Sequence, residues 1–135
     1  MMKKLTQYKK NNNITYFCNY HIIWCTKYRR DLLKNGADTD LINIIQDVAN
    51  ELNVDITEIE VMPDHVHILA NVNPQLGVHK FIKTSKGRSS RQLRIKHKAL
   101  KSRVPTLWTN SYFISTVGGA TLDVVKKYIE DQKNV

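Results

Sequence analysis

Residues 54–72 read VDITEIEVMPDHVHILANV, and this stretch decides the fold. In residues 54–61 apolar and polar side chains alternate, which is typical of a strand. Residues 65–72 are rich in β-branched residues and predict a second strand. The short turn at Pro63 and Asp64 predicts that the two strands pair as an antiparallel hairpin. Successive side chains of a strand point to opposite faces. The predicted faces of the first strand are Val54, Ile56, Glu58 and Glu60 on one side and Ile59 and Val61 on the other.

Residues 14–28, before this hairpin, predict a long strand because aromatic and β-branched residues dominate them. One face would carry Tyr16, Cys18, Tyr20, Ile22 and Trp24, and the other Phe17, Asn19, His21, Ile23 and Cys25. A polar turn containing Gly36 follows. Asp40 is a good N-cap, and apolar residues at helical spacing predict a helix from there to Asn53.

After the hairpin, a helix is expected from Val78, with an interruption at Gly87 and a continuation capped by Ser89 or Ser90. Pro105 would end it. Residues 112–117 predict a fourth strand, and Gly118-Gly119 a flexible joint before a last helix that runs from Thr121 or Asp123 to about Gln132. The order β-α-β-β-α-β-α predicts an α+β fold of the ferredoxin-like or RRM-like kind. Its antiparallel sheet carries helices on one face, and a C-terminal helix is added.

The positive charge is concentrated in one segment. The chain has 135 residues, enough for one domain spanning 1–135, and a net charge of +9. Residues 80–103 hold ten basic residues and no acid, which leaves eleven basic residues against twelve acids elsewhere. Such a segment indicates a surface for a polyanion. Residues 1–13 are polar and lysine-rich and are read as a mobile basic arm.

Other classes of protein are not favoured by the sequence. The sequence contains no run of 18 apolar residues, so no membrane-spanning helix is expected. The lysines near the start are not followed by an apolar segment, so no signal peptide is expected. Cys18 and Cys25 would lie on opposite faces of one strand, so no disulfide is expected between them. We therefore expect a reduced, cytoplasmic protein.

Two groups of residues could carry chemistry. His65 and His67, two apart in a strand, would project from one face, where two imidazoles can bind one metal ion; two solvated histidines are the alternative. Tyr128 and Gln132, four apart on the last helix, would lie one turn apart on one face. The alternative there is a tyrosine at the edge of the core with a solvated glutamine. If a metal binds the non-bridging oxygens of a phosphate, a tyrosine oxygen could attack the phosphorus in line and leave a phosphotyrosine and a free hydroxyl. Such a transesterification stores the bond energy, so rejoining needs no ATP.

The basic segment would present long cations and short hydroxyls on helical turns, as phosphate contacts require. A solvated charged face is the alternative, although such faces usually mix signs. The residues predicted to contact nucleic-acid phosphates are Lys83, Lys86, Arg88, Ser89, Arg91 and Arg94, with Lys27, Arg29 and Arg30 as a second group.

Several segments together resemble one family. They are YHIIWCTKYRR at 20–30, MPDHVHIL at 62–69, FIK with KGRSSR over 81–91, LW at 107–108 with SYF at 111–113, TVG at 116–118 and KKYIEDQ at 126–132. In this order and spacing they resemble the IS200/IS605-family transposases, which are single-tyrosine HUH endonucleases. The resemblance covers about residues 14 to 132.

The resemblance implies a homodimeric enzyme that binds DNA hairpins at element ends and cuts and rejoins single-stranded DNA. By that similarity Tyr128 would be the nucleophile and form a 5′-phosphotyrosine link. His65, His67 and Gln132 would be ligands of Mg²⁺, or of Mn²⁺ in its place. The active site would be shared between subunits, and the protein would associate with the nucleoid. Asp64, beside the histidines, is a candidate for an outer-sphere contact to the site.

Three other functions remain open at this point. A non-catalytic nucleic-acid-binding module of RRM-like fold could stack bases on Tyr16, Tyr20 and Trp24. A zinc hydrolase would use water as its nucleophile and would not need Tyr128. A domesticated relative could cut chromosomal repeat hairpins without moving an element.

Overall fold

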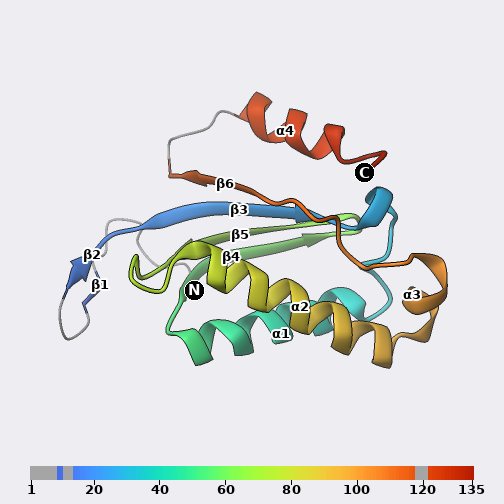
Figure 1. Cartoon of the computed structure of the whole chain (residues 1–135), viewed down its shortest axis with the longest axis horizontal. Helices are drawn as coiled ribbons and strands as arrows, with labels where there is room; N and C mark the ends of the chain where they lie inside the picture. The colour runs from blue at the N-terminus through green and yellow to red at the C-terminus, as the bar shows by residue number, and fades with distance from the viewer. Residues whose placement is uncertain (1–8, 11–13, 118–121) are drawn as a thin grey trace.

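A four-stranded antiparallel sheet is the centre of the fold (Figure 1). The computed structural model describes residues 9–10, 14–117 and 122–135. The strands follow the order β4-β5-β3-β6 and are β3 (Asn19–Cys25), β4 (Asp55–Met62), β5 (His65–Asn71) and β6 (Phe113–Thr116). A separate two-stranded ribbon of β1 (Lys9–Lys10) and β2 (Thr15–Tyr16) lies at one end of the sheet (Figure 1). The predicted hairpin of β4 and β5 is confirmed.

The helices are divided between the two faces of the sheet. The long helices α1 (Ala37–Leu52) and α2 (Val78–Lys96) cover one face, and the short α3 (Lys98–Arg103) follows α2 (Figure 1). The C-terminal helix α4 (Leu122–Asp131) lies over the opposite face (Figure 1). The predicted α+β class, with helices on one face and an added C-terminal helix, is therefore confirmed. No helix among the described residues is long and apolar enough to cross a membrane.

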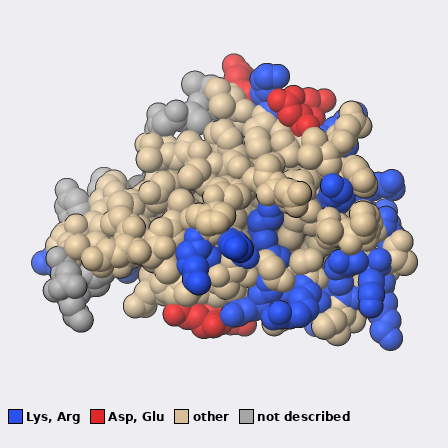
Figure 2. Space-filling view, in the orientation of Figure 1, with Lys and Arg blue, Asp and Glu red and all other residues tan. Residues whose placement is uncertain are grey.

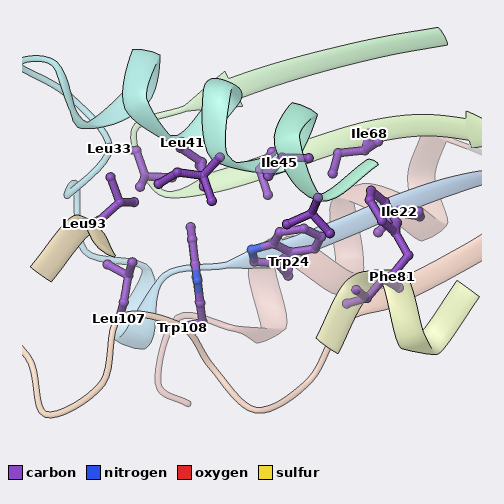
Figure 3. Close-up of a cluster of buried hydrophobic side chains, with 14 of the residues drawn as sticks. Ile22, Trp24, Leu33, Leu41, Ile45, Ile68, Phe81, Leu93, Leu107 and Trp108 are labelled. Carbon is purple, nitrogen blue, oxygen red and sulfur yellow. The ribbon is translucent and has the colours of Figure 1, made fainter. Parts of the chain in front are cut away.

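The core lies between the sheet and helices α1 and α2 (Figure 3). Ile22 and Trp24 of β3 and Val66 and Ile68 of β5 point into it, each fully buried. The Trp24 ring meets the Trp108 ring edge to face, at 5.9 Å between centroids. This confirms the predicted alternation of β3 and β5. The odd-numbered histidines of these strands consequently face α4 instead of the core.

The first predicted strand is shorter than expected. Pairing with β5 begins at Asn19, and the Cys18 N–H donates to the side chain of Asn71 (3.0 Å). After Cys25 the chain turns into a 3₁₀ turn, η1 (Lys27–Arg29). Both Cys18 and Cys25 are free thiols, as predicted.

Helix α1 begins at Ala37, so the prediction of Asp40 as N-cap is wrong. Gly36 occupies the cap position at φ 98°, a conformation that glycine adopts without strain. Asp40 lies in the first turn, and its carboxylate accepts hydrogen bonds from His97 and Lys96 at the end of α2. The predicted end at Asn53 is confirmed by its left-handed backbone and by its N–H bond to the Ala49 carbonyl.

Helix α2 passes through Gly87 without a break, so the predicted interruption is wrong. A helical glycine costs only ~1 kcal/mol relative to alanine, and buried residues on both sides of Gly87 hold the helix to the core. Phe81 and Leu93 are two of these anchors. Ser89 caps nothing: its hydroxyl donates to the Lys86 carbonyl and accepts from the Trp108 indole.

A β-bulge in β4 overturns one predicted face. The register with β5 shifts between Ile56 and Glu58. Such a shift inserts one residue and reverses the alternation beyond it. Ile56, Ile59 and Val61 therefore all pack against the core, although Ile56 was expected opposite the other two. The predicted joint at Gly118-Gly119, the cap at Thr121 and most of the basic arm lie outside the described residues.

Candidate active site

His65 and His67 project from the face of β5 that looks toward α4, and they are joined there by His21 of β3. The strand register places His67 opposite Ile23, and His21 opposite Leu69. His21 Nδ1 lies 3.1 Å from His67 Nε2, and the two rings stack at 5.3 Å between centroids. Burial, and then the neighbouring His21, lower the pKa of His67. His67 is consequently neutral at neutral pH, which is the form that binds a metal.

His65 is oriented by its neighbour Asp64. Its Nδ1 lies 2.7 Å from Asp64 Oδ1, and the other carboxylate oxygen of Asp64 accepts from Arg29. Burial alone would raise the pKa of Asp64, but the hydrogen bonds from His65 and Arg29 outweigh it and lower this pKa. An ionised Asp64 accepts the Nδ1 proton of His65, so Nε2 of His65 is left as an electron-pair donor.

A cavity of about 390 Å³ separates these histidines from α4. Its lining residues are His21, Ile23, Glu60, His65, His67 and Ser115 from the sheet and Val125, Lys126 and Ile129 from α4. One side is therefore formed by imidazoles and a carboxylate, and the other by aliphatic side chains and one lysine.

Tyr128 and Gln132 lie together, as predicted, but beside Ser111 instead of the histidines. The Tyr128 hydroxyl is 2.8 Å from Ser111 Oγ, and the tyrosine ring packs against Phe113 at 5.4 Å between centroids. Burial raises the pKa of Tyr128. Gln132 follows the end of α4 and is only 7% exposed. Its Oε1 accepts from Ser111 (3.0 Å), and its Nε2 donates to the Tyr128 carbonyl (3.3 Å).

The structure thus divides the predicted site residues into two pairs within one chain. His65 and His67 line the cavity, whereas neither Tyr128 nor Gln132 is among the residues that line it. In the part of the chain that the structure describes, no group of three His, Cys, Asp or Glu side chains could hold a metal ion.

Comparison with known proteins decides the family. The model of the family described as "Transposase IS200 like" matches residues 14–132. The chain belongs to the IS200-like transposases. This confirms the family resemblance, and it makes the chain a member of a class of enzymes that cut DNA and transfer its strands.

Similar proteins support this assignment. The ISDra2 transposase TnpA of Deinococcus radiodurans is 38% identical over 126 residues, which are 92% of this chain and 90% of that protein. The transposase for insertion sequence element IS200 of Salmonella typhimurium is 31% identical over 86% of this chain and 80% of its own length. A solved structure from Deinococcus radiodurans R1, described as a transposase, superposes with a TM-score of 0.85. It is 35% identical and covers 94% of this chain and 99% of that one.

A second solved structure shares the fold alone. It is a REP-associated tyrosine transposase bound to a REP hairpin, with a TM-score of 0.56 and 13% identity. The match covers 96% of this chain and 69% of that chain.

Three of the predicted DNA contacts on α2 have partners within the protein. Arg88 forms an ion pair with Glu51 of α1. Lys86 is half-buried, and its ammonium donates to the carbonyls of Thr109 (2.7 Å) and Ser111 (3.0 Å). Burial lowers the pKa of Lys86 to about 8. Ser89 is fully buried against Trp108, so the prediction that it contacts DNA is wrong.

Other predicted contacts lie at the surface. Lys83 and Arg91 are exposed, and Arg94 is partly exposed. A hollow of about 730 Å³ is lined by Gly87, Ser90, Arg91, Arg94, Ile95, Lys98 and Lys101. Lys83 lines a neighbouring hollow of about 420 Å³. Figure 2 shows the basic side chains gathered over α2 and α3, on a face where acidic groups are confined to its edges.

In the second group of predicted DNA contacts, Arg29 is paired with an acidic residue, whereas Lys27 and Arg30 are not paired in this way with any residue that the structure describes. Arg30 is exposed, and the ammonium of Lys27 lies 4.9 Å from the centre of the Tyr28 ring. Arg29 is instead engaged by Asp64. Sequence reasoning missed Ser111 as a site residue, because a single serine in a loop belongs to no periodic pattern; only the fold places it beside Tyr128 and Gln132.

Proposed function

We propose that this transposase binds DNA hairpins at the ends of a mobile element, cuts single-stranded DNA with Tyr128 and rejoins the strands. The observation that carries the proposal is the pair His65 and His67 on one face of β5, beneath the helix that bears Tyr128 (Figure 1). The family assignment supports the reaction class.

The strand-transfer step balances without an external energy source. The Tyr128 oxygen attacks phosphorus, an O–P bond forms, and the bond from phosphorus to the 3′ oxygen breaks. The products are a 5′-phosphotyrosine and a free 3′-hydroxyl, and the phenolic proton leaves to a base or to solvent. Attack by another 3′-hydroxyl reverses the step and joins the new strand, so ATP is not needed.

His65 and His67 fit a metal site as two of its ligands. Asp64 occupies Nδ1 of His65, so Nε2 is available to a ligand in the cavity; a carboxylate behind a metal-binding histidine is a common arrangement. Mg²⁺, or Mn²⁺, would supply charge to polarise the phosphate. Gln132 is the proposed third protein ligand, and phosphate oxygens would supply the oxygen ligands that Mg²⁺ prefers.

We further propose that the enzyme is a homodimer whose site is shared between subunits. The support is that Tyr128 and Gln132 are held at Ser111, outside the cavity that the histidines of the same chain line. A second copy would then supply these two residues to the histidines. The arrangement is reciprocal, as the two-fold symmetry of a dimer requires.

The basic face over α2 and α3 is the proposed DNA surface. Lys83, Arg91 and Arg94, together with Lys98 and Lys101, surround hollows that a sugar-phosphate backbone could enter. The binding-module alternative loses its main support. Tyr16 and Trp24 are buried and Tyr20 packs against the core, so these aromatics offer no platform for stacking bases.

A cleavage assay tests the proposal. Single-stranded DNA carrying a flanking hairpin is incubated with Mg²⁺ and wild type, Tyr128→Phe or Tyr112→Phe, and a denaturing gel reports the protein–DNA adduct. Tyr112 is the matched control, because its hydroxyl contacts His79 of α2, the helix on the face of the sheet opposite α4 (Figure 1). We expect an adduct with wild type and Tyr112→Phe only. Cutting by Tyr128→Phe without an adduct would indicate a water nucleophile and contradict the proposal.

A further inference from the structure

Arg29 makes its shortest contacts with the carboxylate of Asp64, the residue that precedes His65. Its Nε donates to Asp64 Oδ2 at 3.0 Å, and a terminal guanidinium nitrogen reaches the same oxygen at 2.9 Å. The side chains of Arg29 and Asp64 are 23% and 15% exposed. A guanidinium in this double contact is much less available to DNA phosphates than an extended surface arginine.

The backbone around Arg29 is held in an uncommon conformation. Tyr28 and Arg29 have φ angles of 57° and 51°, which residues other than glycine rarely adopt. The surrounding hydrogen bonds maintain it. The Thr26 N–H donates to the Asp64 carbonyl (2.9 Å), and the Thr26 hydroxyl donates to the Arg30 carbonyl (2.7 Å). The Lys27 N–H donates to the Leu107 carbonyl.

Asp64 connects Arg29 to His65. One of its carboxylate oxygens accepts a hydrogen bond from Arg29, and the other lies 2.7 Å from His65 Nδ1. With Arg29 in place, the carboxylate has one orientation, and it accepts the Nδ1 proton. We propose that Arg29 is a positioning residue that acts through Asp64 to hold His65 in the tautomer whose Nε2 faces the cavity. This inference rests on the proposed role of His65 as a metal ligand.

Arg29 also reaches toward the tyrosine helix. A second terminal nitrogen lies 3.7 Å from a carboxylate oxygen of Glu130 on α4, whose side chain is 73% exposed. Exposed pairs of this kind contribute little to stability. Asp64 is therefore the partner through which Arg29 acts, and Glu130 offers a matched control on the same arginine.

The tautomer can be measured directly. Long-range ¹⁵N–¹H NMR spectra of the full chain at about pH 8, where free imidazole is neutral, distinguish Nδ1–H from Nε2–H rings. We expect His65 in wild type and Glu130→Gln to be in the Nδ1–H form. In Arg29→Gln and Asp64→Asn the Nε2–H form should increase, and Arg29→Lys should be intermediate. An unchanged His65 signal in a folded Arg29→Gln protein would overturn the inference.

Metal and DNA binding give a second, independent readout. Loss of an outer-sphere partner typically lowers metal affinity 10- to 100-fold. We expect Mn²⁺ affinity to fall about tenfold in Arg29→Gln, and the double variant with Asp64→Asn to be no weaker than Asp64→Asn alone. Affinity for single-stranded DNA without metal should be unchanged. If Arg29→Gln instead weakens metal-free DNA binding and leaves the His65 tautomer intact, Arg29 is a DNA contact and the inference fails.

The same experiments separate this inference from the proposed function. If His65→Ala binds Mn²⁺ as well as wild type does, the proposed metal site fails, whereas the tautomer measurement still tests Arg29. If His65→Ala loses Mn²⁺ and Arg29→Gln does not, only the role of Arg29 is rejected. Arg30→Gln, an exposed neighbour, controls for the loss of one positive charge in the tautomer and Mn²⁺ measurements.

Discussion

Replacing Ser111 with alanine should loosen the docking of α4. The substitution removes the hydroxyl that bonds to Tyr128 (2.8 Å) and to Gln132 (3.0 Å). Each such bond contributes ~0.5 to 1.5 kcal/mol, and the buried Gln132 oxygen would lose its partner. We therefore expect ~2 kcal/mol less docking free energy, which is an increase of about 30-fold in the undocked population. The bond from Lys86 to the Ser111 carbonyl does not depend on the side chain.

Hydrogen exchange monitored by mass spectrometry measures this directly. Peptides covering residues 122–135 should exchange about 30-fold faster in Ser111→Ala, while peptides from α1 and β5 should exchange as in wild type. Ser102→Ala is the control, because its hydroxyl only bonds within α3. Equal exchange of α4 in Ser111→Ala and Ser102→Ala would refute the conclusion that Ser111 holds the helix.

The remaining predictions concern assembly, pH and salt. An equal mixture of His65→Ala and Tyr128→Phe subunits should recover about a quarter of wild-type adduct formation if the site is shared; the denaturing gel would show none if each site is formed within one chain. Lys86 has a folded pKa near 8, below its unfolded value of 10.5. From pH 8 to 10.5 the unfolded chain therefore binds more protons, and stability rises with pH. Chemical denaturation should show wild type gaining ~1 to 2 kcal/mol over Lys86→Met across that window, a figure reduced for the solvent exposure of Lys86. DNA affinity should fall steeply with salt, and Arg91→Gln and Arg94→Gln should each lower the log–log slope by about one; titrations at several salt concentrations with unchanged slopes would exclude them as phosphate contacts.

The sequence predicts which face of β5 carries His65 and His67, because side chains alternate strictly between the two faces of a strand. Val66 and Ile68 are apolar and face the core, so His65 and His67 must face the other side. The same reasoning places His21 on that face of β3, where it meets His67. The spacing of Tyr128 and Gln132 predicts their proximity equally well.

Features that depend on tertiary contacts could not be predicted in this way. The bulge at residues 56–58 reverses the face of Ile56, and no residue there marks it. Gly87 stays helical because the core holds α2 on both sides of it. Arg29 and Arg88 belong to patterns typical of DNA contacts, yet each meets a carboxylate more than thirty residues away in the sequence. Charge patterns show which side chains are basic, whereas only the fold shows which of them are already paired.

Tyr128 of α4, the proposed nucleophile, and Gln132 just after α4, the proposed third ligand, are linked through a single proton. A serine hydroxyl has one hydrogen. Because Ser111 donates it to Gln132, the Tyr128 hydroxyl must donate its own proton to Ser111. Burial raises the pKa of Tyr128, whereas the hydrogen bond with Ser111 lowers it. For Ser111 to stabilise a phenolate, its hydrogen must turn from Gln132 to Tyr128, which frees the amide oxygen. Ionisation of Tyr128 and release of Gln132 are therefore favoured together, so the proposed nucleophile and the proposed third ligand become available as a unit.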